Sequence, residues 1–404
     1  MPAGRVYNPG HSGRDGPPSL DARRPLGAVG AVPASAPRRD PRFDFFRGLA
    51  LLMIFNLHFY GSRFTGITLG AVSYCTGAEI FVFISGFVCG MVYLRRLEKD
   101  GFGACQRKAL KRCGQLYGAH LLTFLICFGL FAGFVMLLGT DAGVFRLQPL
   151  LDNPLPAVTR ALMGMYTPLY MDILKLYIIL LLPLPLFLSV YRRWPWPALG
   201  LSVLLYMVAQ IWPHATALPD YPPPQKWFWN PLAWQMLFFI AVALGADRAR
   251  GLSRLPRGTA WTALAIAVLL ALLLLKQTAD LPWRAIDKLR LAPMRIISLL
   301  VMAYVVASCL PAAARFWRSP LLKPVLLCGR HALPVFCFSV GLDYLCSLLL
   351  LETGGSLVVE LALCLSGCAM MMLLAGALSR RRRQRGVQVG AAPVVISGDH
   401  RTAA

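Results

Sequence analysis

The stretch FDFFRGLALLMIFNLH occupies residues 43–58 and places two polar side chains, Arg47 and His58, in an apolar run. They are eleven residues apart, which is about three helical turns, so both fall on nearly one helix face, roughly 16 Å apart along the axis. A cation and an imidazole inside a membrane span are costly unless they line a cavity or take part in chemistry. The stretch therefore predicts a membrane helix with a functional face.

Composition places the whole chain among membrane proteins. Of its 404 residues 57% are hydrophobic and 15% charged, and the mean hydropathy is +0.59, whereas a soluble protein carries roughly 25% charged residues. Apolar runs of about 17 to 25 residues recur, as a hydrocarbon core of about 30 Å requires. We predict an all-α, polytopic membrane helix bundle of about ten transmembrane helices. The candidate spans are 44–61, 76–94, 117–138, 170–190, 195–212, 231–247, 259–275, 293–312, 332–351 and 357–378.

The basic residues are concentrated in alternate loops. By the positive-inside rule this pattern puts both termini in the cytoplasm, which agrees with an even number of spans. The exception is the loop 276–292, which lies on the predicted outer side and still carries Lys276, Arg284, Lys288 and Arg290. We attribute the net charge of +23 to this topology and to contact with anionic membrane lipids, not to nucleic acid.

Three regions differ in composition. Residues 1–40 are rich in Pro, Gly, Ala and Arg without an apolar run long enough for a signal peptide, so we expect a disordered basic extension. Residues 41–380 form the predicted membrane domain, and 381–404 a disordered cytoplasmic tail. The eleven cysteines contain no C-x-x-C pair, so we expect neither a metal site nor a disulfide framework.

The first two spans carry the predicted catalytic groups. His58 lies towards the outer end of its span, and Glu79, at the start of the descending second span, is expected at about the same depth. A carboxylate bound to one ring nitrogen would raise the basicity of the other, as a general base for a hydroxyl requires. The alternatives are that Arg47 is an end anchor paired with Asp44, and that His58 is an interfacial residue.

A basic stretch before the third span is a candidate site for a phosphate-bearing donor. Its cations Lys108, Lys111 and Arg112 precede Tyr117 and His120, and such cations hold phosphates well. The alternative is a plain cytoplasmic loop of the positive-inside kind.

Further polar groups interrupt later spans. Each is explained by packing or pairing at least as well as by catalysis, although Asp343, near the middle of the ninth span, would be expensive without a partner. These positions are Asp172, Gln235, Arg295, Arg330 and Asp343.

Several of these segments together resemble a known family. Asp44-Phe-Phe-Arg47-Gly-Leu-Ala with His58 is similar to the start of acyltransferase-family-3 membrane proteins, and more closely to the OpgC branch, which acylates osmoregulated periplasmic glucans. The resemblance runs in order from about residue 38 to about 380. Its other segments are 78–87, 115–120, 172–177, 230–235, Lys288 with Arg295, and 329–337.

The resemblance implies an O-acyltransferase of the bacterial inner membrane. It implies about ten helices, an acyl-CoA-like donor on the cytoplasmic side and a sugar hydroxyl acceptor on the periplasmic side. His58 would activate the acceptor hydroxyl or assist attack on the thioester, and Arg47 would help to hold the donor. No bound cofactor or metal is implied. Two positions depart from the OpgC branch, since Leu57 replaces an Asp before the histidine and Ser298 replaces a later His.

Other functions fit the same sequence. A related acceptor such as cellulose or an exopolysaccharide is possible, and the acyl group is succinyl or acetyl. A transporter or flippase would line its path with the same charges, although no internal repeat of the kind common in transporters is visible. A third reading is a non-catalytic subunit of a polysaccharide synthase complex.

Overall fold

The computed structural model describes residues 40–58, 68–139, 146–168 and 170–390. Within these ranges the regular elements are helices, together with one isolated β-bridge between Pro219 and Lys226. The helices are α1 Pro41–Leu57, α2 Leu69–Val72, α3 Gly77–Leu138, α4 Gln148–Asp152, α5 Pro154–Leu162, α6 Asp172–Leu181, α7 Leu184–Arg193, α8 Pro195–Ile211, α9 Pro213–Thr216, α10 Pro231–Ala249, α11 Thr259–Thr278, α12 Trp283–Ile286, α13 Pro293–Cys309, η3 Arg315–Arg318, α14 Lys323–Arg330, α15 Ala332–Glu352 and α16 Leu357–Gly390.

The helices that carry the site begin with clear start signals. Asp40 caps α1 by accepting the backbone N–H of Arg42, and Pro41 follows as the first helical residue. At α3, Glu79 accepts hydrogen bonds from the backbone N–H and the hydroxyl of Thr76, at 2.9 and 2.6 Å. This capping box fixes Glu79 at the first turn of α3.

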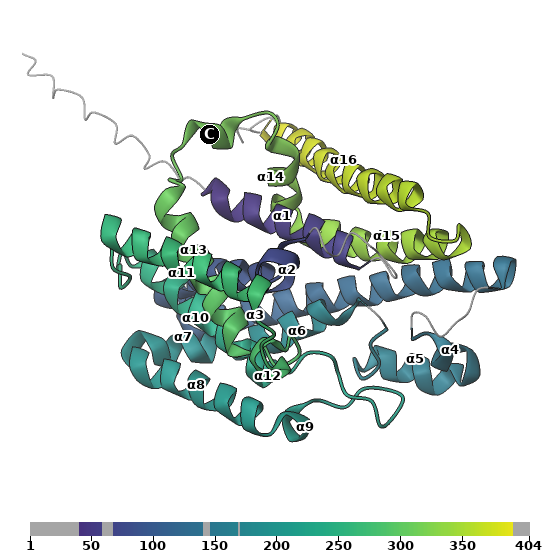
Figure 1. Ribbon diagram of the computed structural model, residues 1–404, viewed down its shortest axis with the longest axis horizontal. Helices are drawn as coiled ribbons and strands as arrows, with labels where there is room; N and C mark the ends of the chain where they lie inside the picture. Colours follow the sequence, from purple (N-terminus) through teal and green to yellow (C-terminus); the bar gives the residue numbers. More distant parts are fainter. Residues whose placement is uncertain (1–39, 59–67, 140–145, 169, 391–404) are drawn as a thin grey trace, which may run out of the picture. The chain divides into compact units, whose positions relative to one another are not determined.

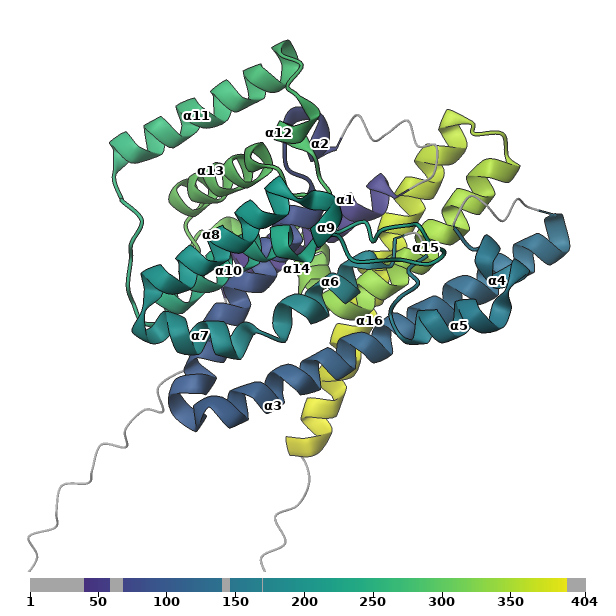
Figure 2. The same ribbon diagram turned by 90° about the horizontal axis from the view of Figure 1, so that it is seen from below.

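The long helix α3 consists of two arms. Gly101 has φ +78°, a left-handed conformation that glycine adopts without a Cβ clash. The chain therefore turns there between a first arm, 77–100, and a second arm, 102–138. Figure 2 shows the second arm running along α15 towards α4 and α5.

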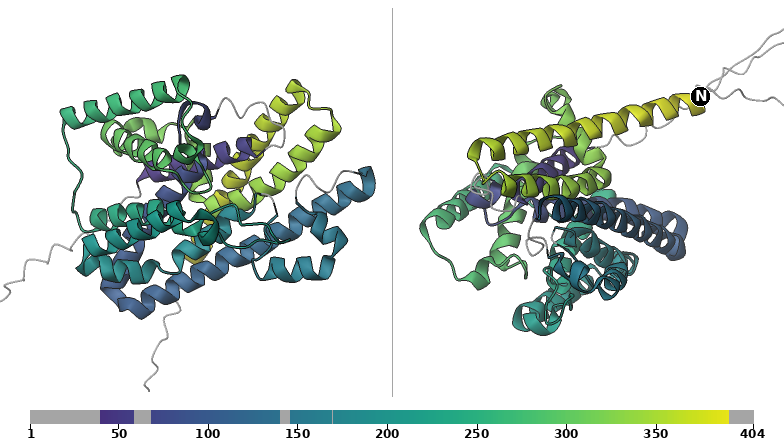
Figure 3. Two further views of the ribbon diagram at one scale, coloured as in Figure 1. Left: turned by 60° about the horizontal axis from the view of Figure 1, so that its bottom comes forward. Right: turned by 90° about the vertical axis from the view of Figure 1, so that its right-hand side faces the viewer.

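Helix α1 lies within the bundle, against α14, α3 and α15 (Figure 1). Glycines allow its closest approach, because a Cβ on Gly48 would collide with the carbonyl oxygen of Val325, and one on Gly329 with that of Asp44. The first arm of α3 packs on α10 in the same close manner. Helix α16 lies against α14 and α15 (Figure 3).

The ten predicted spans fall on helices where the structure describes them, although 76–94 and 117–138 share α3 and 170–190 is divided between α6 and α7. Among the described residues, five helices are long and apolar enough to cross a membrane: α3, α10, α11, α15 and α16. The bent pair α6 and α7, which meet at 43°, would make a sixth. The number of ten spans and the cytoplasmic position of both termini stay predictions.

The outward faces of these helices are apolar. Helix α11 has a mean hydropathy of 2.1 in its most apolar window and no buried residue. At the end of α3, the side chains of Met136 and Leu137 are 86% and 84% exposed. Such faces are stable against lipid tails and not against water. Long apolar helices with bare apolar faces indicate a membrane protein.

The domain boundaries expected from composition are only partly visible. Helix α16 continues to Gly390, ten residues beyond the predicted end of the membrane domain at residue 380. Residues 1–39 and 391–404, which cover most of the two predicted tails, lie outside the described residues.

Candidate active site

His58 and Asp343 form a hydrogen-bonded pair. His58 is the C-cap of α1, and its Nδ1 lies 3.2 Å from Oδ2 of Asp343 in α15. The side chain of Asp343 is fully buried, whereas that of His58 is 23% exposed. When the Asp343 carboxylate is ionised it can only accept, so the ring then carries its proton on Nδ1 and Nε2 is left as an acceptor. This is the arrangement of a general base with an orienting carboxylate.

The ring of Tyr170 packs against one face of the His58 ring. The two rings stack with their centroids 4.3 Å apart and their planes 15° apart. Tyr170 in turn meets Tyr344 edge to face at 6.3 Å. Tyr170 has φ +71°, a left-handed conformation that is uncommon for a bulky residue. Backbone strain of this kind concentrates at functional sites.

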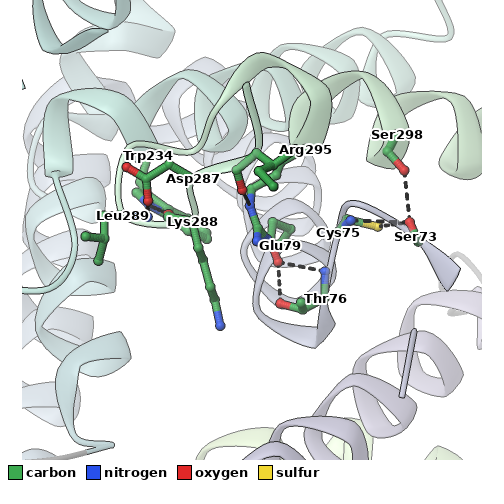
Figure 4. Close-up of polar contacts among 11 residues, drawn as sticks. Ser73, Cys75, Thr76, Glu79, Trp234, Asp287, Lys288, Leu289, Arg295 and Ser298 are labelled. Atoms are coloured by element: carbon green, nitrogen blue, oxygen red, sulfur yellow. Dashed lines mark hydrogen bonds and ion pairs between the residues drawn. The ribbon is translucent and has the colours of Figure 1, made fainter. Parts of the chain in front are cut away.

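The structure does not pair Glu79 with His58, so that expectation was wrong. The fully buried Glu79 accepts a 2.6 Å ion-pair hydrogen bond from Arg295 of α13 as well as the capping bonds from Thr76 (Figure 4). Arg295 also donates from Nε to the carbonyl oxygen of Ile286 at 2.7 Å. The expected depth of Glu79 in the membrane did not predict its partner, because the capping bonds with Thr76 and the ion pair with Arg295 fix its carboxylate.

A cavity of ≈ 210 Å³ opens around Arg47, on the stretch of α1 that precedes His58. Arg112, from the second arm of α3, lines the same cavity, together with Tyr93 and Tyr177. The remaining lining is mainly apolar, from α3, α6 and α15. Two cations in a largely apolar cavity suit a donor that has anionic groups and a hydrophobic arm.

The other predicted donor residues divide into two groups. Lys108 stays near the cavity, with its ammonium 5.3 Å from the ring centroid of Tyr93. Lys111 is exposed, the Tyr117 hydroxyl donates to the carbonyl oxygen of Leu162 in α5, and His120 is buried. Of these residues, Arg112 lines the Arg47 cavity, and Lys108 contacts Tyr93, which lines it. Lys111, Tyr117 and His120 are not among the lining residues.

The remaining polar positions have local partners. Asp44, buried at the start of α1, forms a 3.2 Å ion pair with Arg330, and its pairing with Arg47 in the alternative interpretation stays a prediction. Asp172 accepts from the indole of Trp227 at 2.5 Å, and Gln235 accepts from the hydroxyl of Ser202 at 2.7 Å. Asp44, Arg330 and Gln235 thus join helices to one another.

Sequence reasoning gave no catalytic or binding role to Tyr170, Lys175 or Lys288. The ring of Tyr170 stacks on that of His58. Lys175 donates to the Thr167 hydroxyl at 2.7 Å and lies 4.3 Å from the ring centroid of Trp227. For Lys288 a signal was available, because it belongs to the loop 276–292, which breaks the charge rule on the predicted outer side. The backbone angle of Tyr170 has no sequence signal.

Asp220 and Lys288, which both lie in loops, have perturbed acidity. Burial raises the pKa of Asp220 in the loop before α10, and the Lys175 cation opposes this. Burial lowers the pKa of the Lys288 ammonium, with Glu79 opposing and Arg295 reinforcing the shift. Among the described residues, no group of three or more His, Cys, Asp or Glu side chains could hold a metal ion.

A family model described as OpgC protein matches residues 39–383. The chain belongs to the OpgC protein family. The matched range includes all the site residues from Arg47 to Asp343. Membership of this family is consistent with a glucan-modifying acyltransferase. The wider relationship to acyltransferase family 3 stays a prediction. Neither the curated proteins nor the solved structures contain a significant match to this OpgC-family chain.

Proposed function

We propose that this OpgC-family chain is an O-acyltransferase of the bacterial inner membrane. It would move an acyl group from a cytoplasmic thioester donor of the acyl-CoA type to a hydroxyl of an envelope glucan or exopolysaccharide. The observation that carries the proposal is the 3.2 Å contact between Nδ1 of the partly exposed His58 ring and the buried Asp343 carboxyl group. With Asp343 ionised, this contact leaves Nε2 of His58 as the acceptor that a general base needs. A binding or packing role does not need a buried carboxylate behind a histidine.

His58 acts on the acceptor. The acceptor hydroxyl gives its proton to Nε2 while its oxygen attacks the thioester carbonyl carbon, and the carbonyl pair moves onto oxygen. When the C=O bond re-forms, the C–S bond breaks, the thiolate leaves and His58 returns the proton to it. The products are an ester and a free thiol. Asp343 stabilises the imidazolium that exists between the two proton transfers.

The Arg47 cavity serves the donor. Arg47 and Arg112 face one cavity from two different helices, so they would bind anionic groups of the donor through charge-assisted hydrogen bonds. Arg47 and His58 are separated by roughly three helical turns along α1. A donor of the acyl-CoA type has an arm long enough to carry its thioester from one end to the other. The acyl group, succinyl or acetyl, and any polysaccharide synthase partner are left open by this geometry.

The direct test is a transfer assay on the purified protein. We would supply succinyl-CoA or acetyl-CoA together with glucan oligosaccharides and follow free thiol with a colorimetric reagent. Thiol release that requires glucan and is lost in His58→Ala supports acyl transfer. Thiol release that persists in a folded His58→Ala variant contradicts the role of the histidine. A wild-type protein that releases no thiol would instead favour transport or a non-catalytic subunit.

A further inference from the structure

The first residue of α6, Asp172, is hydrogen-bonded to a tryptophan from a distant loop. The indole N–H of Trp227 donates to Oδ1 of Asp172 at 2.5 Å, across 55 positions of the chain. Trp227 is buried, and an indole has a single N–H to donate. The bond therefore ties the start of α6 to the loop that leads to α10.

Trp227 is itself held in place from two sides. Its backbone N–H donates to the carbonyl oxygen of Leu218 at 2.8 Å. The centroid of its ring lies 4.3 Å from the ammonium of Lys175, a second residue of α6. Asp172 and Lys175 are three residues apart, so they lie on one face of the helix, and Trp227 contacts both. The indole thus fixes the position and the rotation of the first turn of α6.

Tyr170 precedes that first turn by two residues. Its backbone has φ +71°, and the buried Met171 follows it as the N-cap of α6. Two residues span at most about 7 Å, so the place where α6 begins limits where the Tyr170 ring can lie. A left-handed backbone is costly for a tyrosine and persists only where the surrounding structure imposes it. The anchored start of α6 is a structure of that kind.

Two contacts together set the orientation of the His58 ring. The 3.2 Å contact between Nδ1 and Asp343 fixes one direction, but it still permits the ring to rotate about that direction. The stack with Tyr170, at 4.3 Å between centroids and 15° between planes, fixes the plane of the ring. The direction in which Nε2 points therefore depends on the Tyr170 ring as well as on Asp343.

We propose that Asp172 and Trp227 are positioning residues, whose hydrogen bond holds the Tyr170 ring against His58 and so directs Nε2 towards the acceptor hydroxyl. This inference rests on the proposed acyltransferase function. When the bond is lost, the start of α6 can shift and the stack loosens, so Nε2 leaves its productive direction for part of the time. A small misplacement of a general base slows the reaction, so kcat falls while donor binding at Arg47 is unchanged.

The competing role for the bond is a general contribution to the fold. The two roles differ in how they combine with the loss of the Tyr170 ring. A contact that only stabilises the fold lowers kcat to the same extent whether the ring is present or not. A contact that acts through Tyr170 has no further effect once that ring is removed, which is what a double-mutant cycle measures.

The experiment measures kcat, KM and melting temperature for the full-length protein, with a CoA thioester and glucan oligosaccharides as probes. Trp227→Phe keeps a ring beside Lys175 but lacks the N–H, and Asp172→Leu lacks the acceptor at similar size. We expect kcat to fall by about threefold to tenfold in both, the range for one aromatic stack, with little change in KM. Asp172→Asn keeps an acceptor oxygen and should stay close to the wild type.

Two further variants separate positioning from stability. Trp227→Phe is repeated in the Tyr170→Ala background, where we expect no additional fall in kcat. The matched control is Trp317→Phe. Trp317 is also buried, and its indole N–H donates to the carbonyl oxygen of Pro311 at 2.9 Å. This control should lower the melting temperature about as much as Trp227→Phe does, and it should keep the wild-type kcat.

Three results would overturn the positioning role and leave the acyltransferase function intact. One is a wild-type kcat in Trp227→Phe. Another is an equal fall in kcat when Trp227→Phe is added to Tyr170→Ala. The third is a loss of kcat in Trp317→Phe that matches the loss in Trp227→Phe. An inactive wild type, in contrast, contradicts the acyltransferase function itself, and the role of Asp172 and Trp227 with it.

Discussion

Nδ1 of His58 lies 3.2 Å from Oδ2 of Asp343, although 285 positions separate the two residues in the chain. The pair joins the C-terminal end of α1 to the buried middle of α15. It orients the one histidine that the resemblance marks as catalytic, and the carboxylate comes from a distant helix instead of the neighbouring position, which is Leu57.

Asp343→Asn tests this orienting role. The amide keeps the size of the side chain but can present a donor to the ring, so the tautomer with a free Nε2 is no longer enforced. We expect kcat to fall by about a hundredfold to ten-thousandfold with KM little changed. Glu352→Gln, at the exposed end of the same helix, is the control and should keep wild-type kinetics. A wild-type kcat in Asp343→Asn would remove Asp343 from the mechanism.

Arg47→Gln and Arg112→Gln test the donor cavity. Each variant removes a cation from the cavity lining while His58 and Asp343 stay in place, so the donor KM should rise about tenfold, the effect of one charge-assisted hydrogen bond. Arg107→Gln, an exposed cation on the same arm of α3, should leave KM unchanged. Equal donor KM values in all three variants would place the donor elsewhere.

Tyr170 combines a strained backbone with a ring stacked on His58, and the two can be separated. Tyr170→Phe keeps the ring, so its kcat should stay within a few-fold of the wild type. Tyr170→Gly and Tyr170→Ala both lose the stack, and we expect about a tenfold lower kcat. Because φ is +71°, the Ala variant should be less stable than the Gly variant by about 1 kcal/mol. A more stable Ala variant would mean that the left-handed backbone conformation is not required.

Glu79 is predicted to hold the fold. In Glu79→Gln the partly buried Arg295 loses the counter-ion that the fully buried Glu79 supplies, so we expect the free energy of unfolding to fall by about 3 kcal/mol. The matched control is Glu98→Gln, which breaks the exposed 2.8 Å pair with Arg250 and should cost less than about 1 kcal/mol. Detergent unfolding of both variants gives the comparison. A similar decrease in the free energy of unfolding in both variants would show that the Glu79–Arg295 pair stabilises the fold no more than an exposed ion pair does.

The positions of the helices were readable from the sequence, because apolar runs and their polar or proline-rich borders are local properties. The pairing of side chains was not. Helical periodicity puts Arg47 and His58 on one face but cannot say that α15 brings Asp343 to that face. The sequence did indicate that Asp343 needs a partner, because an unpaired carboxylate in the middle of a membrane span is costly.

The misplacement of Glu79 has a physical cause that the sequence already contained. Thr76 and Glu79 are three residues apart at the start of an apolar run, the spacing of a capping box, and this ties the carboxylate to the helix start. An equal depth in the membrane was weaker evidence for a contact between Glu79 and His58, since several polar groups lie at the same depth. The stacking of Tyr170 on His58 depends on a backbone angle, which local patterns do not determine.

The most direct test of acyl transfer is mass spectrometry of alkali-labile acyl groups on purified envelope polysaccharides. Three strains are compared: the wild type, a deletion, and the deletion complemented with His58→Ala that still inserts into the membrane. We predict that one acyl group is present in the wild type and missing from both mutants, which would also identify the acyl group and the polymer. Unchanged acylation in all three strains would contradict the proposal.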